Sequence, residues 1–212
     1  MLSNRINSLP ASATLAMAAK ARELKNNGVD IIGLSLGEPD FNTPEFIKDA
    51  AIQAVKDNYN SYSPVDGYAD LKEAICTKFK RDNGLDYQPS QIVVSTGAKQ
   101  SIANVCMVLL DPGDEVLLPA PYWVSYSAIA TLAEAKSIII PSSIETDFKI
   151  TPEQLEKAIT PKTKLVMFNS PNNPSGIIYT EEEYRALGAV FEKYPDIYIL
   201  SDEIYEHINY GT

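Results

Sequence analysis

Short apolar runs alternate with amphipathic runs along the chain from about residue 91 onward. The apolar runs are rich in β-branched and aromatic residues and predict strands, whereas the amphipathic runs predict helices. Strands that alternate with helices favour a mainly parallel sheet, because each helix carries the chain back to the same end of the sheet. The expected fold class is therefore α/β, a doubly wound sheet with helices on both faces. The expected strands cover 92–94, 115–118, 138–140, 164–168 and 197–200.

The first 85 residues or so have a different pattern, mainly helical and peripheral to the sheet. Residues 1–10 are polar and irregular and predict an arm rather than a core element. The Thr-Pro pair at 43–44 is a helix start signal, with the threonine as N-cap and the proline at the first helical position. The expected elements are a helix over 13–25, a strand over 31–36, a helix from 43–44 onward and a helix over 71–79.

Charge and residue content exclude several classes of function. The formal net charge is −10, which argues against non-specific binding to nucleic acid or to anionic membranes. His207 is the only histidine, so no Ser-His-Asp triad and no multi-histidine metal site can form within this chain. No carboxylate cluster has the spacing of a calcium loop either, so we expect no metal site.

Cysteine usage and hydropathy favour a cytoplasmic protein. Cys76 and Cys106 lie in helical patterns and form no C-x-x-C motif, so free thiols in a reducing compartment are expected. The N-terminus lacks the basic region and apolar core of a secretory signal. No apolar run approaches the ~20 residues of a membrane span, so no membrane partner is expected.

Polar and aromatic residues follow several of the expected strands at their carboxyl ends, where open α/β sheets bind ligands. Asp202 and Tyr205 follow the last strand, although an acid and a phenol there also fit a plain surface turn. Trp123, the only tryptophan, follows the second strand, although large aromatics are commoner in cores. Asn173 lies in a proline-rich turn after the fourth strand, and Asn-Pro pairs are also simply good turn formers.

The segment 95–101 (STGAKQS) lies between the first expected strand and a helix. Its small residues let backbone N–H groups approach an anion, and a helix N-terminus adds about half a positive charge. It matches neither the Walker loop nor G-x-G-x-x-G, so an ordinary strand–helix turn is the alternative. Four such signals on one rim together predict a pocket for a planar, anionic ring compound. This pocket would offer N–H groups for a phosphate, Trp123 for the ring face, Asn173 and Tyr205 for a ring oxygen, and Asp202 for a ring nitrogen.

Six motifs occur in order from about residue 10 to the end of the chain, and together they resemble a known protein family. The chain resembles the N-terminal portion of class I pyridoxal-phosphate-dependent aminotransferases of fold type I, and it is similar to their aspartate aminotransferase branch. The motifs are LSLGEPDF (34–41), YSPVDGYADLKEAI (62–75), STGAKQS (95–101), PYWVSY (121–126), NSPNNPSG (169–176) and SDEIYEH (201–207).

The resemblance implies a role for each matching position around pyridoxal 5'-phosphate. A buried carboxylate beside the pyridine nitrogen favours the protonated ring, which is the electron sink of this cofactor. The resemblance implies Asp202 and Tyr205 as the catalytic residues. The implied cofactor-binding residues are Gly97, Ala98 and Lys99 through their backbone at the phosphate, Trp123 on the ring face, Asn173 and Tyr205 at the ring hydroxyl, Asp202 at the pyridine nitrogen, and Tyr62.

The same resemblance implies substrate contacts and a homodimer. Gly37 would contact the α-carboxylate of the amino acid, with Trp123 and Asn173 nearby. Tyr62 would reach across the dimer interface to the phosphate of the partner's cofactor. Residues 1–45 would form an N-terminal arm and part of a small domain, and 46–212 a truncated large domain that binds the cofactor.

Two features of the family lie outside this sequence. Members carry a lysine, beyond the SDEIYEH motif, that forms the Schiff base with the cofactor, and an arginine near the C-terminus that binds the substrate carboxylate. Lys99 lies in the phosphate loop and is not expected to replace that lysine. The chain also stops at Thr212, shortly after its last expected strand, so we expect an incomplete sheet and a fragment that is inactive alone.

The expected function of the parent protein is amino transfer between an L-amino acid, aspartate or a similar one, and a 2-oxo acid. One alternative is a carbon–sulfur lyase or decarboxylase, because the same scaffold supports several reactions. Another is a non-catalytic ligand-sensing domain, such as the aminotransferase-like half of a transcription regulator. That alternative normally has a basic DNA-binding module at its N-terminus, whereas this chain is acidic and its family pattern starts near Met1.

Overall fold

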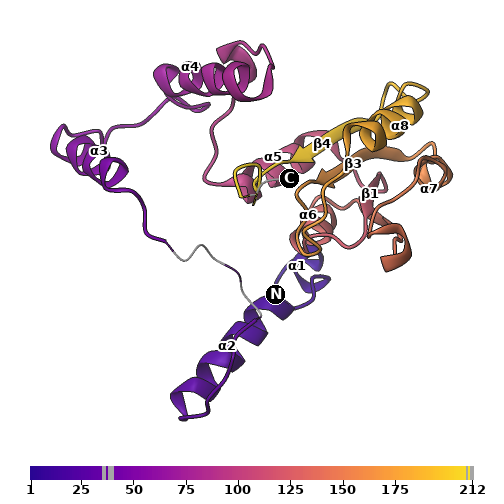
Figure 1. Ribbon diagram of the computed structural model, residues 1–212, viewed down its shortest axis with the longest axis horizontal. Coiled ribbons are helices and arrows are strands. Elements are labelled where there is room, and N and C mark those ends of the chain that lie inside the picture. Colours follow the sequence, from indigo (N-terminus) through magenta and orange to yellow (C-terminus); the bar gives the residue numbers. More distant parts are fainter. Residues whose placement is uncertain (35–36, 38–40, 209, 211–212) are drawn as a thin grey trace. The chain divides into compact units, whose positions relative to one another are not determined.

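A computed structural model describes residues 1–34, 37, 41–208 and 210. The chain divides into two units. Figure 1 labels helices and strands of both. Met1–Leu9 and Val94–Thr212 form the first, called the sheet unit below, and Pro10–Val93 forms the second, called the helical unit.

The sheet unit is built on a four-stranded sheet with the order β2-β1-β3-β4, in which every neighbouring pair is parallel. Leu117 lies opposite Ile138 on one side and Val166 on the other, and Asn169 lies opposite Asp202. All strands therefore end at the same rim. The strands are β1 (Glu115–Pro119), β2 (Lys136–Ile140), β3 (Thr163–Asn169) and β4 (Tyr198–Asp202).

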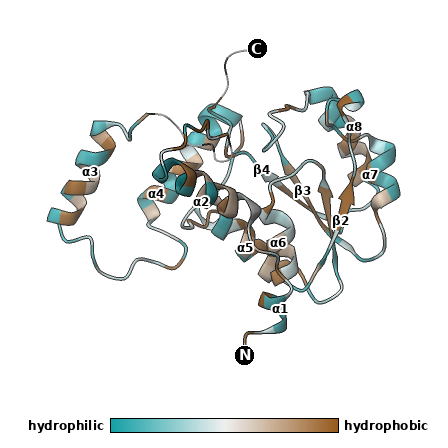
Figure 2. Cartoon of the chain, turned by 90° about the horizontal axis from the view of Figure 1, so that it is seen from below, coloured by the Kyte–Doolittle hydropathy of each residue, from teal (hydrophilic) through white to brown (hydrophobic). Residues whose placement is uncertain are grey.

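Helices cover both faces of this sheet, as Figure 2 shows. Alternate residues of β1 point to opposite faces, so Val116 and Leu118 pack on one side and Leu117 on the other. Each fully buried leucine contributes about 2 kcal/mol to the free energy of folding. One face is covered by α5 (Ala98–Leu109) and α6 (Ser125–Leu132), the other by α7 (Pro152–Ala158) and α8 (Glu181–Phe191).

Two short helices complete the sheet unit. The first, α1 (Asn4–Asn7), contacts α6, and Arg5 lies 4.0 Å from Glu134. The second is η3 (Ile144–Thr146). Capping boxes begin α7 at Thr151, paired with Gln154, and α8 at Thr180, paired with Glu183.

The helical unit consists of helices joined by extended or irregular segments. Ser12 caps α2 by accepting a hydrogen bond from the N–H of Leu15. Gly84 follows the last helical turn with a φ of 68°, a conformation that favours glycine. The elements are α2 (Ala13–Asn26), α3 (Glu45–Lys56), α4 (Ala69–Lys78), the π-helical turn η1 (Phe79–Asn83) and the 3₁₀ turn η2 (Pro89–Gln91).

The fold class is confirmed, with corrections at three expected elements. The strand over 92–94 is wrong: Ile92 has extended dihedral angles, but no described strand pairs with this segment. Local β propensity sets the extended backbone, whereas a strand also needs a hydrogen-bonded neighbour. Pro44, not Thr43, is the N-cap of α3, and no side chain caps that helix. Of the expected strand 31–36, residues 31–34 have no regular structure, and 35–36 lie outside the described residues.

No helix within the described ranges is both long and apolar enough to cross a lipid bilayer.

Candidate functional site

Asp202 is the last residue of β4 rather than part of the segment after it, and only 9% of its surface is exposed. Its carboxylate accepts two hydrogen bonds. Oδ2 accepts one from the Tyr126 hydroxyl at 2.6 Å, and Oδ1 accepts one from the backbone N–H of Ile204 at 3.2 Å. A buried carboxylate is costly unless it is hydrogen-bonded in this way, so the rim provides a prepared place for a negative charge.

Tyr126 is the donor in the shorter of these bonds, and it lies on α6 with 1% of its surface exposed. Burial raises the pKa of its phenol far above the ordinary value, and the hydrogen bond to Asp202 and the charge of that residue raise it further. Tyr126 therefore stays neutral and donates its proton to the hydrogen bond without transferring it. Its ring also packs edge-to-face against Trp123, with 5.5 Å between the ring centroids.

Asn169 ties together two of the segments that carry expected site residues. It is the last residue of β3 and is buried. Its Nδ2 donates to the backbone carbonyl of Asp202 at 2.8 Å, and its Oδ1 accepts from the backbone N–H of Asn173 at 2.7 Å. Asn173 in turn donates from Nδ2 to the Tyr205 hydroxyl at 3.3 Å. The structure thus brings Asp202, Asn173 and Tyr205 together through one amide side chain.

The expected phosphate loop forms the start of α5. Gly97 precedes the helix with a φ of 81°, in the region that favours glycine, and no side chain caps the helix. Within the described part of the chain, the backbone N–H groups of Ala98 and Lys99 have no protein acceptor. Unpaired N–H groups at a helix N-terminus are the usual donors for a bound phosphate.

Lys99 connects this loop to Trp123. Its ammonium nitrogen lies 4.9 Å from the centroid of the Trp123 ring, which is a cation–π contact. Contacts therefore run without interruption from Lys99 through Trp123 and Tyr126 to Asp202, and on through Asn169 to Asn173 and Tyr205.

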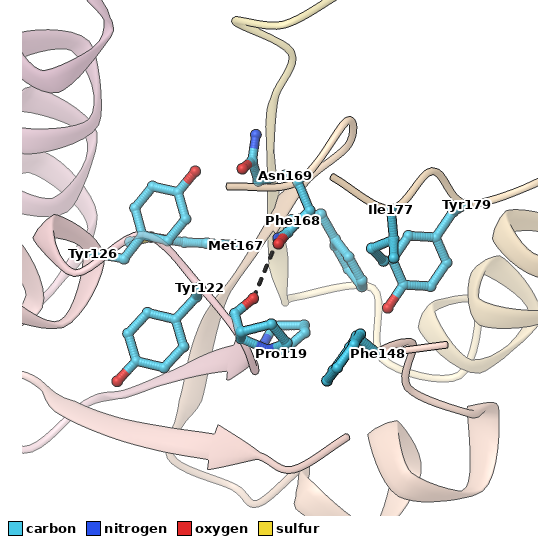
Figure 3. Close-up of a pocket in the computed structure, with 11 residues that line it drawn as sticks. Pro119, Tyr122, Tyr126, Phe148, Met167, Phe168, Asn169, Ile177 and Tyr179 are labelled. Carbon is cyan, nitrogen blue, oxygen red and sulfur yellow. Dashed lines mark hydrogen bonds between the residues drawn. The ribbon is translucent and has the colours of Figure 1, made fainter. Parts of the chain in front are cut away.

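The loops that follow β1 and β3 both line a pocket (Figure 3). Asn172 donates from Nδ2 to the carbonyl oxygen of Pro121 at 3.2 Å. Its Oδ1 accepts from the hydroxyl and the backbone N–H of Ser175, at 2.7 and 3.1 Å. The Asn-Pro turn is therefore held by side-chain hydrogen bonds as well as by its prolines. Aromatic residues form much of the pocket wall: Tyr122, Tyr126, Phe148, Phe168 and Tyr179.

Two expected residues lie in the helical unit. Tyr62 is fully exposed there, and Gly37 has no atom near the position of an added side chain. Other residues of the motif 34–41, namely 35–36 and 38–40, lie outside the described residues. The roles of Gly37 and Tyr62 therefore stay predictions.

Comparison with known proteins places this rim in a family. A family model described as aminotransferase class I and II matches residues 29–212. The chain belongs to this family. An aspartate/prephenate aminotransferase of Nitrosomonas europaea is 55% identical over 207 residues, covering 98% of this chain and 52% of that protein. The aspartate aminotransferase of Bacillus subtilis is 51% identical over 210 residues, covering 99% and 53%.

Solved structures of aminotransferases have the same fold. The aspartate aminotransferase of Rhizobium meliloti superposes with a TM-score of 0.96 at 45% identity, over all of this chain and 53% of that one. The Thermus thermophilus enzyme, determined with maleate, gives 0.95 at 43% identity, over all of this chain and 55% of that one. The chain spans about half the length of the curated relatives it matches.

Pyridoxal 5'-phosphate is the cofactor of this aminotransferase family, as expected. The donor set of the rim fits it. Asp202 offers a buried carboxylate that is already hydrogen-bonded, and Ala98 and Lys99 offer unpaired N–H groups. The half-buried Trp123 contacts both groups of residues: its ring packs against Tyr126, the partner of Asp202, and against Lys99 of the phosphate loop.

Tyr126 and Asn169 are hydrogen-bonded to residues of this candidate site but were not expected from the sequence. Both lie inside the family motifs: Tyr126 ends PYWVSY, three residues after Trp123, and Asn169 begins NSPNNPSG. The short spacing keeps Tyr126 near Trp123, and residues at strand ends share a rim. These two placements are the signals by which both residues could have been found.

Proposed function

We propose that this chain is the N-terminal half of an aminotransferase that moves an amino group between L-aspartate, or a similar acidic amino acid, and a 2-oxo acid. The complete protein is the longer aminotransferase of which this chain would be a part. The observation that carries the proposal is the contact series on the rim, because it links the residues for the phosphate, the ring and the ring nitrogen within one unit.

In this proposal each residue of the rim holds one part of pyridoxal phosphate. The N–H groups of Ala98 and Lys99, with the backbone of Gly97, bind the phosphate at the positive end of α5. Trp123 stacks on the ring. Asn173 and Tyr205, which already share a hydrogen bond, bind the ring hydroxyl.

Asp202 has the central electrostatic role. Its buried carboxylate stabilises a proton on the ring nitrogen, because an opposite charge at close range favours the charged form of the ring. When bound, the cofactor supplies an electron sink for the carbon that loses its proton. Asp202 holds the ring in the state that accepts those electrons, while Tyr205 holds the neighbouring ring oxygen.

The substrate class is supported by relatives and by charge. Curated relatives are named aspartate or aspartate/prephenate aminotransferases, and the Thermus structure was determined with maleate, a dicarboxylate. Lys99 places a positive charge over Trp123, which favours an anionic ligand on this rim. Gly37 and Asn173 would contact the α-carboxylate of the amino acid.

The proposal also covers assembly and location. Tyr62, fully exposed in the helical unit, would reach the cofactor phosphate of a second subunit in a homodimer. The acidic chain and its two free cysteines are in keeping with the cytoplasm.

The chain of 212 residues is proposed to be inactive alone, because the lysine that binds the cofactor in this family lies beyond the SDEIYEH motif. The test measures oxo acid formation from L-aspartate with pyridoxal phosphate and a 2-oxo acid acceptor. The complete protein should turn over continuously and carry a borohydride-fixable cofactor on one lysine beyond residue 212. Sustained turnover by the 212-residue chain, or a borohydride-fixed adduct on Lys99, would refute this assignment of roles.

A further inference from the structure

We propose that Tyr126 is a positioning residue for the aminotransferase reaction, which fixes the carboxylate of Asp202 so that it can pair with the ring nitrogen of the cofactor. This inference rests on the proposed function, because it assumes that Asp202 meets that nitrogen. It adds a residue outside the cofactor and substrate contacts given above.

The geometry around Asp202 carries the inference. Among the described residues, its carboxylate has two hydrogen-bond donors, and only one of them is a side chain, the hydroxyl of Tyr126. The bond from Tyr126 is also the shorter, 2.6 Å against 3.2 Å from the Ile204 N–H. Short O–H···O⁻ bonds to a carboxylate are the stronger class of hydrogen bond, so Tyr126 contributes most to its orientation.

Tyr126 is itself held in place by the core. It lies on α6, packed in the cluster that includes Ile102, Val116 and Met167, and its ring meets Trp123 edge-to-face. A side chain held this way has little rotamer freedom, so its hydroxyl is a fixed point on the rim. Asn169 fixes the backbone of Asp202 in the same way, through its bond to the carbonyl oxygen. Backbone and carboxylate of Asp202 are thus each held by one side chain from a neighbouring element.

The phenol is suited to donate and not to exchange its proton, because burial and the neighbouring Asp202 charge both raise its pKa. Without this hydroxyl, Asp202 would keep its place in β4 but lose its strongest donor. The buried carboxylate of Asp202 would then be less stable, and its orientation would be less restricted. The part of binding that depends on the ring nitrogen should weaken, whereas the parts at the phosphate and the ring face should not.

A cofactor analogue isolates the part of cofactor binding that depends on the ring nitrogen. In 1-deazapyridoxal phosphate a C–H group replaces the ring nitrogen, so no proton can be shared with Asp202. The ratio of the dissociation constants of the analogue and of pyridoxal phosphate, measured by equilibrium titration of the complete apoprotein, reports the pairing of Asp202 with the nitrogen.

The unmodified protein should bind pyridoxal phosphate more tightly than the analogue. In Tyr126→Phe this preference should fall roughly tenfold, the cost of one hydrogen bond to a charged group, while affinity for the analogue stays the same. The matched control is Tyr122→Phe, which removes a phenol hydroxyl from the segment just before α6. That hydroxyl has no hydrogen bond to any described residue, so the control should keep the parental preference.

Replacement of Tyr126 by 4-aminophenylalanine supplies a rescue. This residue has the shape of tyrosine and keeps an N–H donor at the same atom, so it should retain the parental preference even if Tyr126→Phe does not fold. Equal loss for both cofactors in Tyr126→Phe, no loss at all, or a 4-aminophenylalanine variant without preference would overturn the inference. An unmodified protein with no preference would instead contradict the proposed pairing of Asp202 with the ring nitrogen.

Discussion

The sheet unit and the helical unit differ in where their apolar side chains lie. In β1 three successive residues, Val116, Leu117 and Leu118, are fully buried, because helices cover both faces of the sheet. In α3, by contrast, no residue is buried, and Phe46 and Val55 are 74% and 78% exposed. The amphipathic pattern is clear in both regions, but only in the sheet unit do the described residues supply a covering partner for the apolar face.

This difference explains why some expected site residues are held by hydrogen bonds to buried side chains and others are not. Asp202 ends β4 and Asn173 follows the end of the buried strand β3, and the buried side chains of Tyr126 and Asn169 fix their hydrogen bonds. Gly37 and Tyr62 lie in segments without such a core around them. A ligand site needs rigid support, so the rim of the sheet is the part of the proposed site that this chain specifies by itself.

The comparison is tested most strongly by a matched pair of truncations. Leu165→Ala, in the fully buried centre of β3, should lower the free energy of unfolding by about 2–5 kcal/mol, because it leaves a cavity between packed layers. Ile52→Ala, on the half-exposed side of α3, should change it by less than about 0.5 kcal/mol. Urea unfolding followed by circular dichroism and Trp123 fluorescence measures both. Similar losses for the two variants would show that α3 packs as tightly as β3.

The buried core was predictable from sequence wherever local pattern and tertiary pairing agree. Strand–helix alternation located all four strands of the described sheet. The sequence pattern alone could not predict strand pairing: Ile92 is extended, but no described strand pairs with 92–94. The hydrogen bonds of Tyr126 and Asn169 were missed for the same reason, because they join residues 76 and 33 positions apart in the chain.

Thiol chemistry separates the two units next. Cys106 lies in the core of the sheet unit, where burial raises the pKa of its thiol to about 11, whereas Cys76 is half-buried in the helical unit. At pH 8 only about one in a thousand Cys106 side chains is the reactive thiolate, so iodoacetamide should label Cys76 about 100-fold faster. Raising the pH towards 11 should speed Cys106 labelling as the thiolate fraction grows. Peptide mass spectrometry follows both rates, and equal rates at pH 8 would contradict a closed core around Cys106.

The smallest expected effect concerns a helix start. Thr180 accepts the N–H of Glu183 at 3.2 Å, and the Glu183 carboxylate accepts the N–H of Thr180 at 2.7 Å. Thr180→Ala removes one half of this capping box and should destabilise the sheet unit by about 1 kcal/mol. Thr180→Ser keeps the hydroxyl and is the control, expected close to the parent in thermal unfolding. Equal stability of all three proteins would show that the cap contributes nothing to α8.

The central claim is that Asp202 holds the charge opposite the ring nitrogen, and one variant of the complete protein tests it directly. Asp202→Ala should still bind pyridoxal phosphate, because the phosphate and ring-face contacts remain, but its turnover should fall by about 100- to 1,000-fold, the usual cost of removing a prepared electrostatic partner. Glu203→Ala, which removes the adjacent exposed carboxylate, is the matched control and should keep parental turnover. Near-parental turnover in Asp202→Ala, with cofactor bound, would contradict the account.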